Sequence, residues 1–477
     1  MYAPLFDHGA EMTSFQKQLT LPISAKELFQ WHEREGAFER LCPPWDPVKV
    51  LHKDDHIRDG AKVRLQVKGP MGIPMSLEVI HEGYQKGKCF VDRQVKGPFK
   101  SWRHQHIVEP KDEQTATLTD LINYELPLGI LGNIGGGQMV KKRLSQLFHY
   151  RHQVMQHDVL LHSLNAQYNQ GQKLHVAISG ASGFIGQALT ALFTTGGHKV
   201  TIFSRSTGLN TRVWKEIEQV PKLDDIDVVI HLAGESIAQR WTARKKQSIM
   251  NSRVDRTQAL AQAIADLKKA GKPAPKALIC ASGVGFYGDC SHDGTKVDEN
   301  SPLGQGFLAE VCQAWEEACK PAREQGIRVV NARIGVVLAP HGGALAKLLL
   351  PFSLGLGGPI GQGKQWMSWV SLHDVVGALY FCAVNQNLSG PVNLCSPTAV
   401  TNTEFSKALG RVLSRPTILP TPPFALKLAY GEMAQETILS GQRVEPSKLL
   451  AQGYPFLHTT LEAALRFELG RVKLSNN

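Results

Sequence analysis

Between about residues 12 and 165, short runs of alternating apolar and polar positions predict an antiparallel sheet. A helical region is expected at 25–38, and after the glycines at 135–137 a helical pattern places Val140, Phe148 and Val159 on one face. The predicted strands lie at 15–21, 63–67, 75–79, 90–95, 102–108 and 115–122. An antiparallel sheet closed by a long C-terminal helix makes an α+β domain.

The pattern changes after a polar stretch at 165–173, which we interpret as a linker. Beyond it, apolar strands alternate with helical segments, and this succession predicts an α/β fold with a doubly wound parallel sheet. The predicted strands lie at 174–178, 199–204, 228–232, 277–282 and 329–333. We therefore expect domains at 1–164 and 174–415, followed by a small helical domain at 416–477.

The first strand of the second domain runs into glycines spaced three residues apart, in the sequence VAISGASGFIG at 176–186. Gly180 permits a tight turn, Gly183 lets the backbone approach a phosphate, and Gly186 lets the next helix pack closely against the strand. That helix directs its N–H groups and its positive dipole end at an anion. The pattern predicts a Rossmann-type dinucleotide site, and an ordinary tight turn is the alternative.

The end of the second strand of such a unit selects the cofactor, through a carboxylate for NAD or a cation for the 2′-phosphate of NADP. Here the strand ends in Phe-Ser-Arg-Ser at 203–206, without an acid. Arg205 offers a bidentate fork to a phosphate and Ser204 offers a hydroxyl beside it. The sequence favours NADP(H), and the alternative is that Arg205 is a solvated arginine at a strand end.

Composition narrows the class of protein. The chain has 477 residues and a formal net charge of +11, but its basic clusters are short and fall in helical patterns, so we expect no nucleic-acid binding. No apolar run of about 18 residues occurs and the N-terminus does not resemble a signal peptide, so a cytoplasmic protein without a membrane span is expected. The eight cysteines form no CxxC pair, and we predict neither a metal site nor a disulfide framework.

The N-terminal domain resembles the helix-grip family of polyketide cyclase, START and Bet v 1 type domains. The order of its predicted elements carries this resemblance, together with PPW at 43–45 and WRHQH at 102–106. The family encloses an apolar cavity between a curved sheet and a long helix, which implies a lipophilic ligand here. The alternative is a filled core that binds a protein or nothing.

From 174 to about 470 the sequence resembles the extended short-chain dehydrogenase/reductase superfamily, in its atypical NADP-dependent epimerase-like branch with a C-terminal domain of unknown function. The matching motifs are GASGFIG at 180–186, HLAGE at 231–235, RW at 240–241, SRV at 252–254, FYG at 286–288, CQAWE at 312–316 and RIGVVL at 333–338. The resemblance implies the following sites: the pyrophosphate at Gly180, Gly183, Phe184, Ile185 and Gly186, the 2′-phosphate at Ser204 and Arg205, the length of the cofactor at Ala233, Gly234, Glu235 and Arg240, and the nicotinamide near Val336.

The sequence departs from that superfamily at its catalytic pair. Typical members use Tyr-x-x-x-Lys, in which lysine lowers the phenol pKa and tyrosine passes a proton to the substrate. The helix expected to carry this pair has neither residue, and Ser282 and Tyr287 are the main candidates for proton transfer, with Glu310 and Cys312 as further ones. Tyr287 would need a lowered pKa, and packing is its alternative role. Arg333, His373 and Asp374 are candidates for contact with an anionic substrate, with a helix cap as the alternative for Asp374.

Two functions fit these observations. One is an NADP-dependent oxidoreductase or epimerase that acts on a small molecule with a nonstandard proton donor. The other is a protein that binds NADP without turnover and acts through partners. The missing tyrosine–lysine pair favours this second function, and the resemblance adds a link to cell division, which is described for some members of the family. The sequence leaves the substrate and the oligomeric state open.

Overall fold

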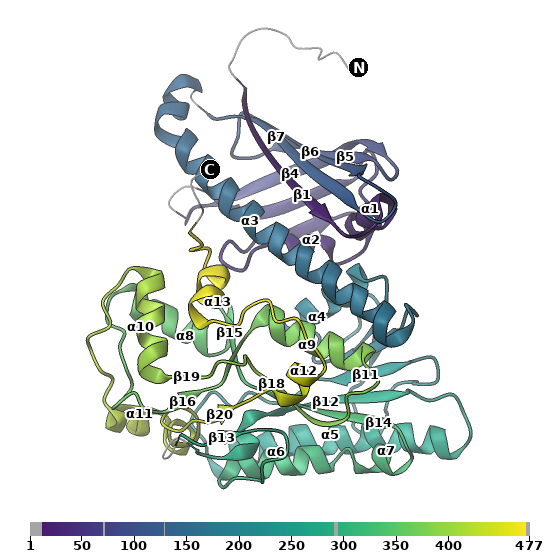
Figure 1. Cartoon of the computed structure of the whole chain (residues 1–477), viewed down its shortest axis with the longest axis vertical. Coiled ribbons are helices and arrows are strands. Elements are labelled where there is room, and N and C mark those ends of the chain that lie inside the picture. The colour runs from purple at the N-terminus through teal and green to yellow at the C-terminus, as the bar shows by residue number, and fades with distance from the viewer. Residues whose placement is uncertain (1–11, 70–71, 128, 291–293, 474–477) are drawn as a thin grey trace. The chain divides into compact units, whose positions relative to one another are not determined.

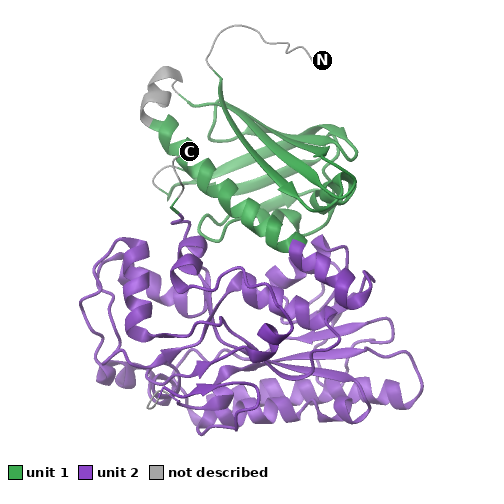
Figure 2. Ribbon diagram, in the orientation of Figure 1, with its two compact units in different colours: residues 1–159, 473–477 green, residues 160–472 purple. Residues whose placement is uncertain are grey.

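A computed structural model describes residues 12–69, 72–127, 129–290 and 294–473 of the chain. The N-terminal stretch on which the signal-peptide argument depends lies almost wholly outside these residues. The chain divides into two compact units, one formed by 1–159 with 473–477 and the other by 160–472 (Figure 2). None of the helices in the described part of the chain has both the length and the apolar character needed to cross a bilayer.

The first unit contains an antiparallel sheet whose described strands follow the order β1-β7-β6-β5-β4-β3-β2. These strands are β1 (Thr13–Leu21), β2 (Lys49–Lys53), β3 (Lys62–Lys68), β4 (Pro74–Gln85), β5 (Cys89–Lys96), β6 (Ser101–Pro110) and β7 (Ala116–Glu125). Two short helices, α1 (Ala25–Glu33) and α2 (Ala37–Leu41), follow β1, and Ser24 caps α1 by accepting a hydrogen bond from the backbone N–H of Glu27. The predicted α+β architecture is present.

The long helix α3 (Gly129–Asn169) differs from the prediction at both of its ends. It begins before the glycines at 135–137, which we expected to break the chain, so these glycines lie inside the helix. It also continues through most of the segment at 165–173 that we interpreted as a linker, and it ends where Gln170 and Gly171 adopt positive φ angles. The first part of this polar segment belongs to the end of the helix, not to a linker. The connection from α3 to the next strand is only a few residues long.

The second unit is built on a parallel sheet with the described strand order β10-β9-β8-β11-β12-β14-β18 (Figure 1). Its strands are β8 (His175–Ser179), β9 (Lys199–Ser204), β10 (Thr211–Val213), β11 (Val228–His231), β12 (Ala277–Gly283), β14 (Arg328–Ile334) and β18 (Gly390–Leu394). The chain starts at β8, builds outwards to β10, and then returns to β11 on the other side of β8. This reversal creates a topological switch point between β8 and β11, where α/β sheets bind their ligands.

Helices pack against this sheet and bury its apolar strands. They are α4 (Phe184–Thr195), α5 (Ala243–Lys269), α6 (Phe307–Glu317), α7 (Lys320–Glu324) and α9 (Leu372–Val384). Residues of β8 and α9 contribute to one core, and Leu260 and Ile264 of α5 pack with Trp315 of α6 in another. The doubly wound α/β fold predicted from the sequence is confirmed.

The chain beyond the sheet belongs to the second unit. Short strands β13 (Lys296–Val297), β15 (Val336–Ala339), β16 (Trp366–Met367), β17 (Trp369–Ser371), β19 (Val400–Thr401) and β20 (Arg443–Val444) form small two-stranded sheets. The remaining α-helices are α8 (Gly343–Ser353), α10 (Asn402–Leu413), α11 (Pro423–Tyr430), α12 (Ser447–Ala451) and α13 (Leu461–Glu468), and a short 3-10 helix and a short π-helix lie at Val284–Tyr287 and Ala434–Ile438. Because α13 shares a core with α8 and α10, and β20 pairs with β13, the C-terminal segment is an integral part of this unit.

Candidate functional site

The glycine-rich turn joins β8 to α4 at the switch point. Gly180 has a φ of 75°, which residues with a side chain rarely adopt, and a Cβ atom there would lie 2.9 Å from the backbone nitrogen of Ala233. Only glycine therefore fits at this position. A Cβ atom on Gly186 would lie 2.6 Å from the Cα atom of Ala181. The two glycines therefore let the turn pass close to the chain after β11 and let α4 start close to its own turn.

Gly183 differs from these two glycines because its surroundings are open. The nearest atom to a Cβ at Gly183 would be the Gly180 carbonyl oxygen, at 3.4 Å. Gly183 is also the N-cap residue of α4, and no side chain of the described residues caps this helix end. The first N–H groups of α4 thus remain available to an anion, which is the arrangement that binds phosphate groups at helix N-termini.

The segment after β11 forms the opposite wall of the switch point, and helix α5 holds its backbone. The Glu235 N–H donates to Ser252 Oγ at 3.0 Å, and Arg253 Nη1 donates to the Glu235 carbonyl oxygen at 3.0 Å. Lys245 forms an ion pair with the Glu235 carboxylate and holds its pKa below the ordinary value. Ser252 and Arg253, which belong to the SRV motif, therefore hold the backbone of the Ala233–Glu235 segment in place.

Basic side chains gather at the carboxyl end of β9. Arg205 is exposed. The pKa of Arg256 on α5 is lowered, mainly by burial and to a smaller extent by the positive charge of Arg205. Arg256 Nη2 donates to the Lys215 carbonyl oxygen at 2.8 Å, and its guanidinium lies 4.9 Å from the centre of the Trp214 ring. The two cations of this region together favour the binding of an anion.

The other residues expected along the cofactor have contacts of their own. Arg240 Nη1 donates to the Leu428 carbonyl oxygen at 2.8 Å and so contacts the C-terminal segment. The ring of Phe184 packs beside Gly342, where a Cβ atom would lie 2.8 Å from it. Val336 starts β15, and its N–H donates to the Ser368 carbonyl oxygen at 2.8 Å.

Ser282 and Tyr287 belong to one buried hydrogen-bond network. Ser282 Oγ donates to Glu316 Oε1 at 2.8 Å, and Arg333 forms a bidentate pair with the same carboxylate, with both distances 2.8 Å. Arg333 Nη1 also donates to the Tyr287 hydroxyl at 3.0 Å, which in turn donates to Asn393 Oδ1 at 2.7 Å. The network joins β12, α6, β14 and β18 directly below the carboxyl ends of these strands.

The surroundings of Tyr287 oppose proton donation. Burial raises its pKa to about 12, and the nearby Arg333 offsets this effect only in part. Catalysis by this phenol requires a pKa that moves towards neutrality. Tyr287 therefore has the environment of a structural hydroxyl that orients Arg333.

A cleft lies beside this network, between the segment that carries Tyr287 and the C-terminal part of the chain. Its lining residues are Gly285, Gly288, Asp289, Gln305, Leu308, Ala309, Gln435, Glu436, Ser440 and Gln442. The Glu436 carboxylate accepts hydrogen bonds from the backbone N–H groups of Phe307 and Leu308, each at 2.9 Å, and so caps α6. The cleft has polar groups on both sides.

His373 and Asp374 are bonded to the C-terminal segment. Asp374 accepts hydrogen bonds from the Leu457 and His458 backbone N–H groups at 2.7 and 3.1 Å, and His373 lies 3.3 Å from the buried carboxylate of Glu468. Both side chains are buried. The role in binding an anionic substrate that we considered for them is wrong, because these contacts tie the C-terminal segment to α9.

Comparison with known proteins places the chain in a family. Residues 176–395 match the NAD dependent epimerase/dehydratase family, and residues 421–468 match a domain of unknown function, DUF1731. The epimerase family protein Mb2239 of Mycobacterium bovis is 45% identical over 305 residues, which cover 62% of this chain and 98% of that protein. This chain belongs to the epimerase family. Human epimerase family protein SDR39U1 is 37% identical over 297 residues, covering 61% of this chain and 99% of that one.

Two solved structures extend the likeness to this family. The nucleoside-diphosphate sugar epimerase from Corynebacterium glutamicum is 31% identical, with a TM-score of 0.79, and the match covers 97% of this chain and 91% of that chain. Human SDR39U1 (isoform 2), solved with NADPH, is 35% identical with a TM-score of 0.58, and the match covers 63% of this chain and 100% of that chain. The first match therefore spans both units of this protein.

The sequence analysis gave no role to three residues of α5 that contact the candidate site, Ser252, Arg253 and Arg256. Because 252 and 256 are four residues apart and 253 and 256 three apart, they lie on neighbouring parts of the helix surface, and this spacing is the signal that could have found them. The resemblance to the epimerase-like branch with its C-terminal domain is confirmed, whereas the helix-grip resemblance of the first unit stays a prediction.

Proposed function

We propose that this chain binds NADP(H) at the switch point and acts as an NADP-dependent oxidoreductase or epimerase on a small molecule. One observation carries the proposal: the glycine turn lies in the same site as two arginines, Arg205 and Arg256, and the end of β9 has no acidic residue. The human relative solved with NADPH supports it, because that protein is matched over its whole length at 35% identity.

Each part of the site has a role in this proposal. The turn at Gly180–Gly186 and the N-terminus of α4 bind the pyrophosphate, and the backbone at Ala233–Glu235 supports the ribose. Ser204, Arg205 and Arg256 bind the 2′-phosphate. When bound, the nicotinamide would supply hydride chemistry, and the remaining task for the protein is to bind the substrate and move a proton.

Ser282 is the residue that we propose for proton transfer. Its hydroxyl donates to Glu316, so a proton that Ser282 Oγ accepts from a substrate hydroxyl is matched by release of its own proton to the Glu316 carboxylate. Tyr287 acts in this proposal as a positioning residue, because it holds Arg333 and Arg333 holds Glu316. The substrate would bind in the adjoining cleft lined by Gly285 and Glu436.

A second candidate function is binding of NADP(H) without turnover. The specific observation that favours it is the raised pKa of Tyr287, to about 12, in a helix arrangement that lacks the tyrosine–lysine pair. In that case the bound cofactor would change the protein's interaction with a partner.

Calorimetric titration with NADPH and NADH tests the cofactor proposal. Arg205→Glu should weaken NADPH binding at least about tenfold and leave NADH binding unchanged, because only NADPH loses a phosphate contact. Lys268→Glu, an equal charge reversal at the far end of α5, serves as the control and should change neither affinity. Equal NADPH affinity in the Arg205 variant and the parent would overturn the 2′-phosphate assignment.

Turnover is tested separately, with NADPH absorbance followed in the presence of carbonyl and quinone compounds and with product analysis for nucleotide sugars, because an epimerase returns the hydride to its substrate and causes no net change of absorbance. A substrate-dependent loss of absorbance, or an epimerised product, whose rate of formation falls by about 100-fold or more in Ser282→Ala supports the enzyme. Tight NADPH binding with no turnover on any compound supports the second candidate.

A further inference from the structure

The first unit contains a buried cluster of histidine and aspartate side chains on four neighbouring strands. His81 on β4 pairs in register with Asp92 on β5, and Asp92 pairs with His104 on β6. His106 lies two residues further along β6, on the same face, opposite Asp120 of β7. Strand register thus brings together residues that are far apart in the sequence.

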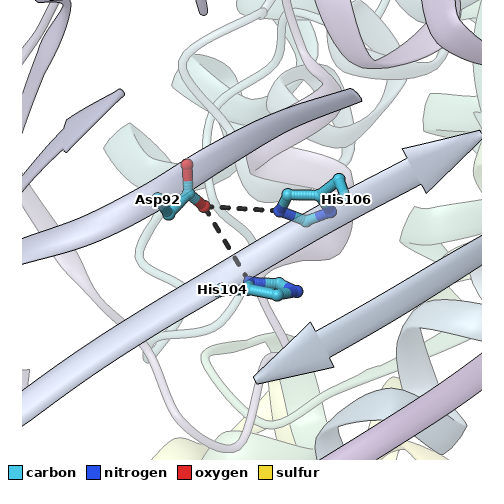
Figure 3. A group of neighbouring side chains, drawn as sticks. All are labelled: Asp92, His104 and His106. Atoms are coloured by element: carbon cyan, nitrogen blue, oxygen red, sulfur yellow. Dashed lines mark hydrogen bonds and ion pairs between the residues drawn. The ribbon is translucent and has the colours of Figure 1, made fainter. Parts of the chain in front are cut away.

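We propose that Asp92, His104 and His106 bind a divalent transition-metal ion of the Zn²⁺ class (Figure 3). Asp92 Oδ2 lies 3.4 Å from His106 Nε2 and 3.9 Å from His104 Nδ1. All three ligand atoms lie within 4.8 Å of one another. Ligand bonds of about 2.0–2.1 Å in a tetrahedral zinc site place neighbouring ligand atoms about 3.3–3.5 Å apart, so small shifts complete three corners of the tetrahedron.

Asp120 orients the two histidine ligands from the other side. Its Oδ1 atom lies 2.9 Å from His104 Nε2 and 2.8 Å from His106 Nδ1. An ionised carboxylate only accepts hydrogen bonds, so with an ion bound these two nitrogens would donate their protons to Asp120 and the opposite nitrogens would be the ones that bind the ion. A carboxylate behind each histidine ligand is the usual outer shell of a metal site.

The ligand Asp92 has a similar supporting contact. His81 Nδ1 lies 2.8 Å from Asp92 Oδ1, which leaves Oδ2 for the proposed ion. The Asp92 side chain is 25% exposed, whereas those of His104, His106 and Asp120 are at most 8% exposed. The proposed site is thus largely buried, and Asp92 is the most exposed of these four side chains.

A divalent cation would also balance the charge of the cluster. Two aspartates in an enclosed site need two positive charges, which one divalent ion supplies and which protons on His81 and His106 supply when no ion is bound. A divalent ion with two neutral histidines makes the group neutral. The rings of Phe90, 4.3 Å from His106, and Phe148, 5.7 Å from His104, exclude water from the inner side.

The neighbourhood carries a second polar signal. His32 of α1 is 8% exposed, and its Nε2 atom has no hydrogen-bond partner among the described residues. Its ring centre lies 5.9 Å from that of His106. This part of the interior is therefore polar, whereas the helix-grip resemblance implied an apolar cavity. Three protein ligands would leave the fourth position of a tetrahedral metal ion for water or another ligand.

Metal titration of the full chain, free of any histidine tag and stripped with a chelator, tests the proposal. We expect one equivalent of Zn²⁺ to bind and to raise the unfolding temperature, and Co²⁺ to give the intense visible absorption of a four-coordinate site. Asp92→Asn should weaken Zn²⁺ binding at least about 100-fold, and Asp120→Asn, which alters only the outer shell, about 10–100-fold.

Asp54→Asn is the matched control. Asp54 lies 3.0 Å from His52 in an exposed histidine–aspartate pair of the same unit, and its substitution should leave Zn²⁺ affinity unchanged. If the Asp92 variant fails to fold, the proposal is tested by the parent alone, through its Co²⁺ spectrum and the effect of Zn²⁺ on its unfolding temperature. No stoichiometric binding by the parent, or equal affinity in parent and folded Asp92 variant, would show that the cluster holds a proton instead and would overturn the proposal.

Discussion

Tyr287 illustrates at the residue scale how burial decides what a side chain can do. The sequence made it one of the candidates for proton transfer because the usual tyrosine–lysine pair is missing, with packing as the alternative role. The structure adds two facts that no local pattern contains: its hydroxyl already has two partners, and burial raises its pKa to about 12. The two partners, Asn393 and Arg333, lie on β18 and β14, which are distant from Tyr287 in the sequence.

We expect Tyr287→Phe to lower the free energy of unfolding by about 1–3 kcal/mol, because Arg333 and Asn393 each lose a buried partner. Denaturant unfolding measures this change, and NADPH affinity should stay the same. Tyr84→Phe provides the control, since its hydroxyl donates to Glu33 at a position that is only partly buried, and the loss of this hydrogen bond should cost less than about 1 kcal/mol. Full stability combined with lost turnover would identify the Tyr287 phenol as the reacting group.

A second residue, His231, makes stability depend on pH. It ends β11, is fully buried, and Ser179 Oγ lies 2.6 Å from its Nδ1 atom. Burial lowers its pKa to about 4 from 6.5, so the unfolded chain takes up the proton first as the pH falls. The stability that neutral His231 contributes is complete above pH 6.5 and is lost progressively down to pH 4.

The test compares unfolding free energies of the parent and His231→Asn at pH 7 and pH 4.5. The parent should lose on the order of 2–3 kcal/mol more than the variant between these values. Other buried histidines lower stability in acid equally in both proteins, so the difference isolates His231. A constant difference between parent and variant across this range would contradict the assignment.

At the scale of elements, the sequence predicted best where the signal is local. The strand, turn and helix at 175–195 follow one another directly, and three glycines define their geometry. The bounds of α3 were missed because a glycine triplet and a polar segment usually interrupt a helix, yet neither stops this one. The tie between SRV and Glu235 was also missed, because it depends on how α5 packs on the sheet.

The glycine turn gives a prediction with an internal control. Gly186→Ala should lower stability by about 1–3 kcal/mol, since its Cβ atom would lie 2.6 Å from Ala181 Cα and α4 must shift. Gly183→Ala should change stability by less than about 1 kcal/mol, because its Cβ atom meets only one oxygen at 3.4 Å. It should nevertheless weaken NADPH binding, because the methyl group stands where the phosphate approaches. Calorimetry with NADPH and denaturant unfolding separate the two effects, and unchanged NADPH affinity in Gly183→Ala would remove the turn from the cofactor site.

At the scale of the whole molecule, the chain joins two units with cores of their own. The division into an α+β part and an α/β part was visible in the change of hydrophobic period. The cluster around Asp92 was not visible, because the register of four strands creates it and the WRHQH run alone shows only two of its members.

Each unit should respond to its own ligand. Hydrogen exchange of the full chain, measured segment by segment with mass spectrometry, should show that NADPH slows exchange in β8, β9 and the start of α4. Saturating Zn²⁺ should slow exchange in β5, β6 and β7, where the proposed ligands lie. At about 100 times the dissociation constant, each ligand adds about 2.7 kcal/mol to the unit that binds it. Asp92→Asn should abolish the zinc effect and keep the NADPH effect, and Arg205→Glu should do the reverse. Protection of β8 by Zn²⁺ in the parent would instead show that α3, which contributes residues to both units, couples the two sites.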